Sequence, residues 1–386
     1  MPQPLFSPLG RVPGVYRQDA AGQAAPVLAT GVPAFVGFVD GAAPVGPLLL
    51  LQKADLDIVT PGWLRDASDG FFDNGGSRCY AIGVPRAATA EASATALIDA
   101  LALAAPLPDV DLVAVPDAAA LLQADGSLDE DQFIRVQRAL ILHCDLHPGR
   151  LALLDALRGK DASALVDAQL RRLAPGRNGP VNAALYHPWL RTVTSGARPI
   201  PPCGPVAGAI ARTDARDGVF RAPANIEILG ATALEADLDS QSLARLNEAG
   251  VNCLRAFPAR GIRIWGARTL SSAGDWRFLN VRRLVLTLLR WIELNMAWAS
   301  FEPHTPALWT RVQRELDNHL VGLWRRGALQ GDTPEEAFYV RCNAEINPPP
   351  VRDAGQLITE IGLAAAAPAE FIVVSVQHRA GRTELL

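Results

Sequence analysis

Two histidines and a cysteine lie close together in the segment His143-Cys-Asp-Leu-His147. Residues four apart share one face of a helix, so His143, Cys144 and His147 could bind a transition metal such as zinc. However, Pro148 ends the helix directly after them, and the glutamate of an H-E-x-x-H metalloprotease motif is missing. We therefore interpret them as helix-end histidines beside a buried core cysteine, and we predict no metal site.

The motifs for nucleotide binding and for nucleophilic catalysis are equally incomplete. The glycine-containing segment that starts at Gly204 is not a G-x-G-x-x-G after a strand, and the chain has no Walker lysine. No G-x-S-x-G turn is present, and Ser195 lies beside a proline-rich segment. The 40 acidic residues do not exclude a paired-carboxylate glycosidase, but no pair stands in a recognisable setting. The sequence thus favours a protein that is not an enzyme and has no cofactor.

The composition is that of a large globular protein. The 386 residues, 49% of them hydrophobic, are enough for two domains. The net charge of −4 argues against a globally basic nucleic-acid-binding protein. Five cysteines without a C-x-x-C pair indicate a reducing compartment. The first residues lack the pattern of a signal peptide. Pro and Gly interrupt the apolar stretch 20–39, and Arg and Glu interrupt 281–301, so we predict a buried helix in the latter and no membrane span.

Short apolar runs alternate with helical patterns in the first half of the chain. The predicted strands cover residues 34–39, 78–84, 110–115 and 151–155, and the predicted helices cover 89–104 and 129–143. Such an alternation is typical of an α/β sheet with helices on its faces.

Four prolines between residues 199 and 205 predict a break in regular structure. We therefore expect an α/β domain over 21–200, a proline-rich connection and inter-domain segment over 201–254, and an α+β C-terminal domain over 255–376.

The two ends of the chain are predicted to be extended β arms, over residues 1–20 and 377–386. The N-terminal arm is rich in proline and lacks enough apolar residues to bury itself. Arms of this kind are suited to adding strands to a neighbouring molecule's sheet. We expect Phe371–Val376 to belong to the chain's own sheet. The arm residues expected at a subunit interface are Val12, Val15, Tyr16, Gln377, Arg379 and Arg382.

Positive charge is concentrated in residues 255–326. This segment holds twelve arginines and five acids, a charge of +7, so the rest of the chain must carry −11 to give the net −4. Two interpretations remain open: a basic face that meets an anionic partner, or arginines that pair with acids elsewhere in the chain. A helix predicted over 305–324 carries Arg311 and Arg314, and Arg325 and Arg326 follow it.

The segment Arg268–Arg283, with the sequence RTLSSAGDWRFLNVRR, resembles the C-terminal domain of contractile tail sheath proteins of phages, extracellular contractile injection systems and R-type bacteriocins. Each motif is weak alone, but they follow the family's order over nearly the whole chain. The further matching segments are Pro13–Tyr16, Phe72–Tyr80, Ala184–Leu190, Ala222–Asn225, Phe301–His304, Ala307–Trp309, Gly327–Gly331, Ala337–Cys342, Asn347–Pro348 and Pro368–Ile372.

The resemblance implies a structural subunit that polymerises as stacked six-fold rings around an inner tube and contracts to drive that tube through a target envelope. It implies a subtilisin-like N-terminal domain, without catalytic residues, and a C-terminal domain that faces the tube, which would place Arg311, Arg314, Arg325 and Arg326 at the tube contact. The alternatives are a baseplate or sheath-terminator component, or an α/β hydrolase-like enzyme.

The partners implied by the resemblance are further copies of the chain, the inner tube protein, and baseplate and terminator proteins, with no nucleic acid and no membrane insertion. Assembly would take place in the bacterial cytoplasm, as part of a phage tail or of a released tail-like particle.

Overall fold

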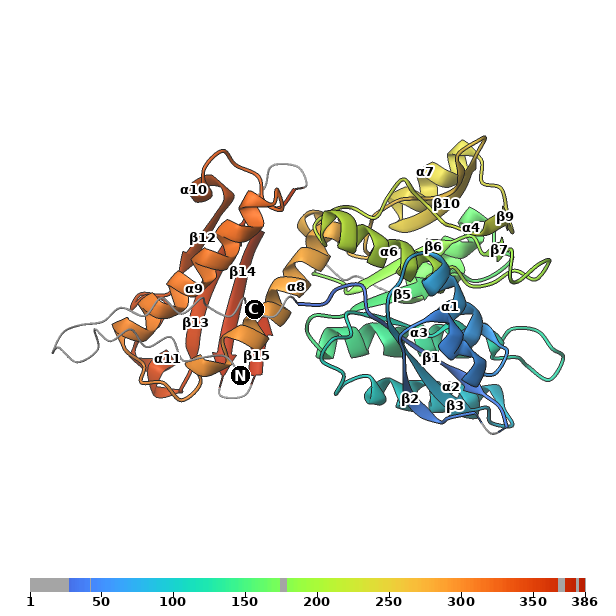
Figure 1. The fold of residues 1–386 in the computed structure, drawn as a ribbon, viewed down its shortest axis with the longest axis horizontal. Helices are drawn as coiled ribbons and strands as arrows, with labels where there is room; N and C mark the ends of the chain where they lie inside the picture. Colours follow the sequence, from blue (N-terminus) through green and yellow to red (C-terminus); the bar gives the residue numbers. More distant parts are fainter. Residues whose placement is uncertain (1–27, 42, 174–178, 367–371, 380–381, 386) are drawn as a thin grey trace, which may run out of the picture.

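The chain forms two units joined by a long helix. The computed structural model describes residues 28–41, 43–173, 179–366, 372–379 and 382–385. Figure 1 shows a larger unit built on a mixed sheet and a smaller unit in which one helix lies along a second sheet. Helix α8 (Leu279–Asn295) lies between them.

The larger unit contains a nine-stranded sheet with the order β2-β3-β1-β4-β5-β6-β10-β11-β8. The strands from β3 to β10 in this order run parallel, and β2, β11 and β8 pair antiparallel at the two edges. The strand bounds are β1 Pro33–Val39, β2 Gly46–Leu50, β3 Cys79–Pro85, β4 Leu112–Ala114, β5 Leu151–Asp155, β6 Ala183–His187, β8 Ile226–Glu227, β10 Val251–Phe257 and β11 Gly261–Trp265. A separate antiparallel pair joins β7 (Leu190–Thr192) to β9 (Ala231–Leu234).

Helices cover both faces of this sheet. Helices α1 (Trp63–Asp73), α6 (Cys203–Asp217) and α8 contribute to one hydrophobic cluster, and α2 (Ala90–Ala100), α3 (Glu130–Leu146), α4 (Ala162–Leu165) and α7 (Ser240–Glu248) contribute to the other. Neighbouring strand residues alternate between the clusters, as Leu112 and Val113 do. A parallel sheet buried on both faces explains why its strands read as continuous apolar runs. The predicted α/β class is confirmed.

The remaining short elements connect these. They are the 3-10 turns Lys53–Ile58, Leu101–Leu103, Pro116–Ala120, Gly274–Trp276 and Ala297–Ala299, the π-helical turn Val166–Leu170, and the short helices α5 (Arg171–Leu173), α10 (Pro334–Ala337) and α11 (Pro349–Asp353).

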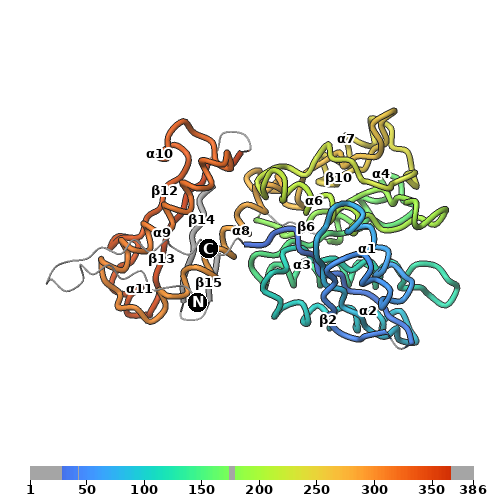
Figure 2. Tube along the Cα trace, viewed as in Figure 1, coloured from blue at the N-terminus to red at the C-terminus, as the bar shows by residue number. Residues whose placement is uncertain are grey.

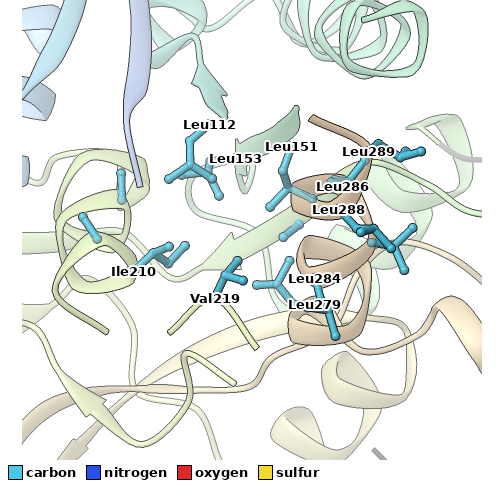
Figure 3. Packing of buried hydrophobic residues seen from close by; sticks show 14 of the residues in the cluster. Leu112, Leu151, Leu153, Ile210, Val219, Leu279, Leu284, Leu286, Leu288 and Leu289 are labelled. Carbon is cyan, nitrogen blue, oxygen red and sulfur yellow. The ribbon is translucent and has the colours of Figure 1, made fainter. Parts of the chain in front are cut away.

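Most of the apolar stretch 281–301, which resembles a membrane span in the sequence, forms helix α8. Leu284 and Leu288 of α8 belong to the same buried cluster as Leu151 and Ile210 of the larger unit (Figure 3). Within the described residues, no helix is both long and apolar enough to cross a bilayer. The prediction of a buried helix here is confirmed.

The smaller unit packs helix α9 (Pro306–Arg325) against an antiparallel sheet. Its strands are β12 (Phe338–Arg341), β13 (Leu357–Leu363), β14 (Ile372–Arg379) and β15 (Arg382–Leu385), in chain order. The side chain of Thr305 accepts a hydrogen bond from the Leu308 N–H and caps the helix. The apolar stripe of α9 consists of Leu308, Val312, Leu316, Leu320 and Leu323, at the spacing of a one-sided helix.

The structure corrects the prediction that the prolines of 199–205 exclude regular structure. Helix α6 begins at Cys203, inside that segment, with Pro205 in its first turn, where a missing N–H leaves no hydrogen bond unmade. Gly204 and Gly208 of α6 face the backbone of α1 so closely that a Cβ at either position would overlap it. The glycines in this segment therefore serve helix packing.

The sheet also differs from the predicted division of the chain at residues 200 and 254. Strand β10 pairs with β6, so residues 201–254 contribute α6, α7 and part of the main sheet rather than a connection. The larger unit thus continues to Trp265 at the end of β11. Pairing between strands more than 60 residues apart leaves no local pattern in the sequence, so the sequence alone favours a boundary that is too early.

Candidate functional site

Four exposed arginines lie on α9 and at its end, away from the apolar stripe. Arg311, Arg314 and Arg325 are helical, and Arg326 is the C-cap residue. The helical spacing of the first three directs them away from the buried leucines. The structure therefore exposes all four residues predicted for the tube contact, with Arg311 and Arg314 in the first half of α9 and Arg325 and Arg326 at its end.

One of these arginines, Arg311, makes contacts within its own unit. The Arg311 guanidinium lies 3.6 Å from the centroid of the Trp298 ring, and its Nε is 3.7 Å from Glu315 Oε1. Trp298 Nε1 in turn donates to Glu315 Oε2 at 2.9 Å. No ion pair with a described residue is present for Arg314, Arg325 or Arg326, so their charges are available to a partner.

Other arginines of the basic segment are buried in the larger unit. Arg283, 3% exposed, donates to both carboxylate oxygens of Asp214 at 2.7 and 2.6 Å and to Asp111 Oδ2 at 3.1 Å. Burial alone would lower the pKa of Arg283, but the ion pairs with Asp214 and Asp111 raise it above its ordinary value. For Arg283, the interpretation as an intramolecular partner of distant acids is confirmed.

The same ion-pair network also binds the backbone that leads into strand β1. Asp111 accepts hydrogen bonds from the backbone N–H groups of Gly31 and Val32 at 3.0 and 2.7 Å. Seven residues after Arg283 on α8, Arg290 donates a hydrogen bond to the Ala29 carbonyl at 3.0 Å. Helix α8 therefore fixes residues 29–32, at the start of the described part of the chain.

The residues of the motif with possible metal ligands are used within the protein. His143 Nε2 accepts from Arg150 Nη1 at 3.0 Å, and burial together with the Arg150 charge lowers the pKa of His143 to about 4. Cys144 is buried, which raises the pKa of its thiol. The ring of His147 lies 4.5 Å from that of His143. A guanidinium on His143 Nε2 would repel a metal cation, and the described part of the chain holds no group of three or more metal-ligating side chains.

The edge at which α/β sheets usually bind ligands is filled by side chains. That place is the carboxyl end of β1 and β4, where the strand order reverses. Asp117 lies there against Gly37, where a Cβ would overlap its carboxylate. Nearby, Asp155 at the end of β5 accepts from the Cys203 N–H at 2.9 Å. Burial raises the pKa of both carboxyls to about 7.

Because the pKa values of these two carboxyls are raised, we expect the stability of the folded protein to depend on pH. Because the folded-state pKa lies above the unfolded value, their contribution is fully present below about pH 4 and is lost as the pH rises through about 7. We expect Asp155→Asn to raise the free energy of unfolding by up to about 4 kcal/mol at pH 8, from a pKa of about 7 against the ordinary 3.8 at about 1.4 kcal/mol per pKa unit, and by less than half of that at pH 5. Urea unfolding at both pH values measures this. The exposed Asp40→Asn variant is the control, and an equal change at the two pH values would contradict the prediction.

The structure describes only part of the predicted arm residues. Val12, Val15 and Tyr16 lie outside the described residues. Gln377 and Arg379 belong to β14 and Arg382 to β15. Strand β14 pairs with β13 from Ile372 to His378, so the prediction that 371–376 belongs to the chain's own sheet is confirmed for its described part. The strand runs through the predicted arm boundary at residue 377, and β15 folds back onto β14 at the sheet edge.

Comparison with known proteins identifies the family. The model for the phage tail sheath protein central domain matches residues 180–270. A putative prophage major tail sheath protein of Pseudomonas aeruginosa is 26% identical over 343 residues, which cover 85% of this chain and 84% of that protein.

Solved structures extend the similarity to almost the whole chain. A chain in the cryo-EM structure of the anti-feeding prophage helical sheath in its contracted state is 30% identical, with a TM-score of 0.72 over 94% of this chain and 97% of that one. The sheath complex of the extracellular contractile injection system PVC, also contracted, is 26% identical with a TM-score of 0.72 over 96% and 97%. With this identity over nearly the full length of both chains, the protein belongs to the family of contractile tail sheath proteins.

Proposed function

We propose that this chain is the sheath subunit of a contractile tail-like machine, which polymerises as stacked six-fold rings around an inner tube and contracts to drive the tube through a target envelope. The observation that carries the proposal is the full-length similarity to a chain of a helical sheath in its contracted state. Energy for the stroke would come from the packing of copies, since the family needs no nucleotide and this sequence has no nucleotide motif.

The basic face of α9 supports a contact with the inner tube. Exposed ion pairs contribute only about 0–1 kcal/mol each. Such weak contacts suit a sheath that must hold the tube before firing and release it during contraction, whereas a large apolar grip would resist the stroke. We infer that Arg311, Arg314, Arg325 and Arg326 meet an acidic tube wall.

The contacts that tie copies together would come from the two arms. Within the described residues, β15 is the last strand of its sheet and pairs with β14 alone. Exchange of a terminal strand for that of a neighbour keeps the same backbone hydrogen bonds, each worth about 0.5–1.5 kcal/mol net, while linking the two copies.

A position at the baseplate end of the sheath is the second candidate. A chain in the anti-feeding prophage baseplate structure is 30% identical to this one, with a TM-score of 0.72. In either position, we propose assembly in the bacterial cytoplasm and a role without catalysis. All five cysteines are buried and free, which agrees with a reducing compartment.

Negative-stain electron microscopy of the purified chain tests the proposal. Tubes or stacked rings are the expected result, and monodisperse monomers under all assembly conditions would contradict it. Added inner tube protein should produce long extended particles, whereas a baseplate component would give short rings only.

Removal of either arm should separate folding from assembly. We expect chains lacking residues 1–17 or residues 377–386 to stay soluble and folded but to form at least tenfold fewer tubes, because the strands that link copies are gone. Circular dichroism and gel filtration check the fold, and particle counts measure assembly. Normal polymerisation of both truncated chains would rule out strand exchange as the link.

A further inference from the structure

Two buried arginines line a pocket between helix α8 and the larger unit, here named the α8 pocket. The pocket has a volume of about 240 Å³ and lies where α8 meets the turn after α3 and the loop before β4. Arg150 lines it from the turn and Arg290 lines it from α8, and each residue is only 5% exposed. The pocket therefore presents two positive charges that are largely removed from bulk water.

The backbone beside the pocket is shaped to seat Arg290. Gly149 has a φ of 90°, in the left-handed region that favours glycine, and a Cβ there would overlap Arg290 Cγ. Three backbone carbonyls accept hydrogen bonds from Arg290, at 3.0, 3.1 and 3.0 Å: those of Ala29, Pro108 and Asp109. Figure 2 shows the described chain beginning, in blue, beside α8. The position of this guanidinium is thus fixed before a ligand binds.

Arg150 is held in a similar way and keeps some of its donors. Its Nη2 donates to the carbonyls of Ala105 and Leu107 at 2.9 and 3.1 Å, and its Nη1 donates to His143 Nε2 at 3.0 Å. A guanidinium has five N–H groups. The hydrogen bonds to described residues use three of them on each arginine, so two remain on each for a ligand.

The two carboxylates closest to Arg290 in sequence position are engaged by other arginines. Asp109 Oδ2 lies 3.2 Å from Arg78 Nη2, and Asp111 Oδ2 lies 3.1 Å from Arg283 Nη2. Their charges favour the protonated form of Arg290, but burial outweighs them and lowers its pKa. Neither acid therefore neutralises Arg290 by direct contact.

Glu293 is the one acid among the residues that line the pocket. Within the described part of the chain it forms no ion pair with Arg150 or Arg290. Burial raises the pKa of Glu293 although both guanidinium groups oppose that change. Burial also lowers the pKa of Arg150, and the charge of Arg290 lowers it further. An anion bound between the two arginines would relieve their repulsion.

The rest of the lining is mainly apolar. It is formed by Leu107, Pro108, Val110 and Leu294, of which Leu294 is 57% exposed. The fork of a guanidinium matches the two oxygens of a carboxylate, and the apolar side chains suit a short hydrocarbon chain. A ligand that is charged at one end and apolar at the other fits both parts of the pocket.

We propose that the α8 pocket binds an aliphatic carboxylate, with the carboxylate at Arg150 and Arg290 and the hydrocarbon part against Leu107 and Leu294. Such a ligand would join α8 to the turn after α3 and to the loop before β4. It would strengthen the packing of α8 on the larger unit, because it binds only where these three segments are together. This inference goes beyond the proposed sheath function and does not depend on it.

Titration calorimetry of the purified chain with sodium acetate, butyrate and phosphate tests the ligand class. Sodium chloride keeps the ionic strength constant. We expect butyrate to bind more tightly than acetate, by about fourfold for each of its two extra methylene groups that becomes buried. Inorganic phosphate should bind more weakly than butyrate. Absence of binding by butyrate, or tighter binding of phosphate than of butyrate, would overturn the proposal.

Substitutions at the pocket mouth test its location without removing the structural arginines. Leu294→Glu places a negative charge in the lining and should weaken butyrate binding at least tenfold. Glu293→Gln removes one and should strengthen binding by about fivefold. Leu142→Glu is the matched control, since Leu142 is 52% exposed on α3 and lies outside the lining.

The control should bind butyrate as the unchanged chain does, and all three variants should keep its circular dichroism spectrum and unfolding midpoint. If folded Leu294→Glu binds butyrate normally, or if Leu142→Glu loses binding to the same extent, the assignment to this pocket is overturned.

A tube assay in saturating butyrate distinguishes two sources of the natural carboxylate. A loss of tubes of at least tenfold would assign the glutamate side chain of a neighbouring copy, whereas unchanged tube numbers would assign a free carboxylate. Both results agree with the ligand class. If the chain forms no tubes at all, the sheath proposal fails, while the titration still decides whether the pocket binds its ligand.

Discussion

Reversal of all four α9 arginines, Arg311→Glu, Arg314→Glu, Arg325→Glu and Arg326→Glu, should prevent the assembly of extended sheaths on inner tubes. Each subunit then presents four negative charges where it had four positive ones, and the repulsion is repeated at every copy along the tube. At about 0–1 kcal/mol per exposed pair, each contact is small, but a ring adds them together. We expect extended particles to fall at least a hundredfold, whereas contracted sheaths without a tube still form.

Co-expression with the inner tube protein and counting of extended particles by electron microscopy measure this effect. Arg311 also stacks on Trp298, so its reversal could disturb the loop before α9. A variant with Arg314, Arg325 and Arg326 reversed separates charge from that local change and should show most of the loss. Normal numbers of extended particles from the quadruple variant would return these arginines to a structural role.

Loss of the buried guanidinium should affect folding instead of assembly. We expect Arg283→Met to lower the free energy of unfolding by about 3–5 kcal/mol, because Asp214 and Asp111 would remain buried without their counter-charge. Urea unfolding followed by circular dichroism measures the change.

Two further variants serve as controls for Arg283→Met. Arg314→Met removes an exposed arginine of α9 and should change stability by less than about 0.5 kcal/mol. Adding Asp214→Asn and Asp111→Asn to Arg283→Met should recover part of the loss, because no buried charge is then left alone. A loss below about 1 kcal/mol for Arg283→Met would show that the network is not important for the fold.

The parallel strands could be predicted well because burial on both faces leaves a continuous apolar run. The strand at 151–155 and the helix that begins after Thr305 match the structure to within a residue. The extent of the sheet could not be predicted. Helix α6 starts among prolines, and β10 reaches β6 across two intervening helices, so neither follows from a local pattern.

The candidate surfaces likewise contain some residues whose position a local sequence pattern predicts and others whose position it does not. The exposed position of Arg311, Arg314 and Arg325 follows from the spacing of the α9 leucines and could be read from the sequence. The partners of Arg283 could not, because Asp111 and Asp214 lie 172 and 69 residues away. The charges at 282, 283 and 290 inside an apolar stretch indicate only that buried polar partners exist elsewhere in the chain, and these are acids for Arg283 alone.

The attachment of residues 29–32 to α8 determines how a mechanical load would travel. Asp111 and Arg283 hold the backbone at Gly31 and Val32, and Arg290 holds it at Ala29. A neighbour that pulls on residues 1–27 would thus pull first on a rigid helix of 17 residues, instead of peeling β1 from the sheet one hydrogen bond at a time. Because α8 lies between the two units, the same pull would move both units together. The subunit would then transmit displacement from copy to copy without local unfolding.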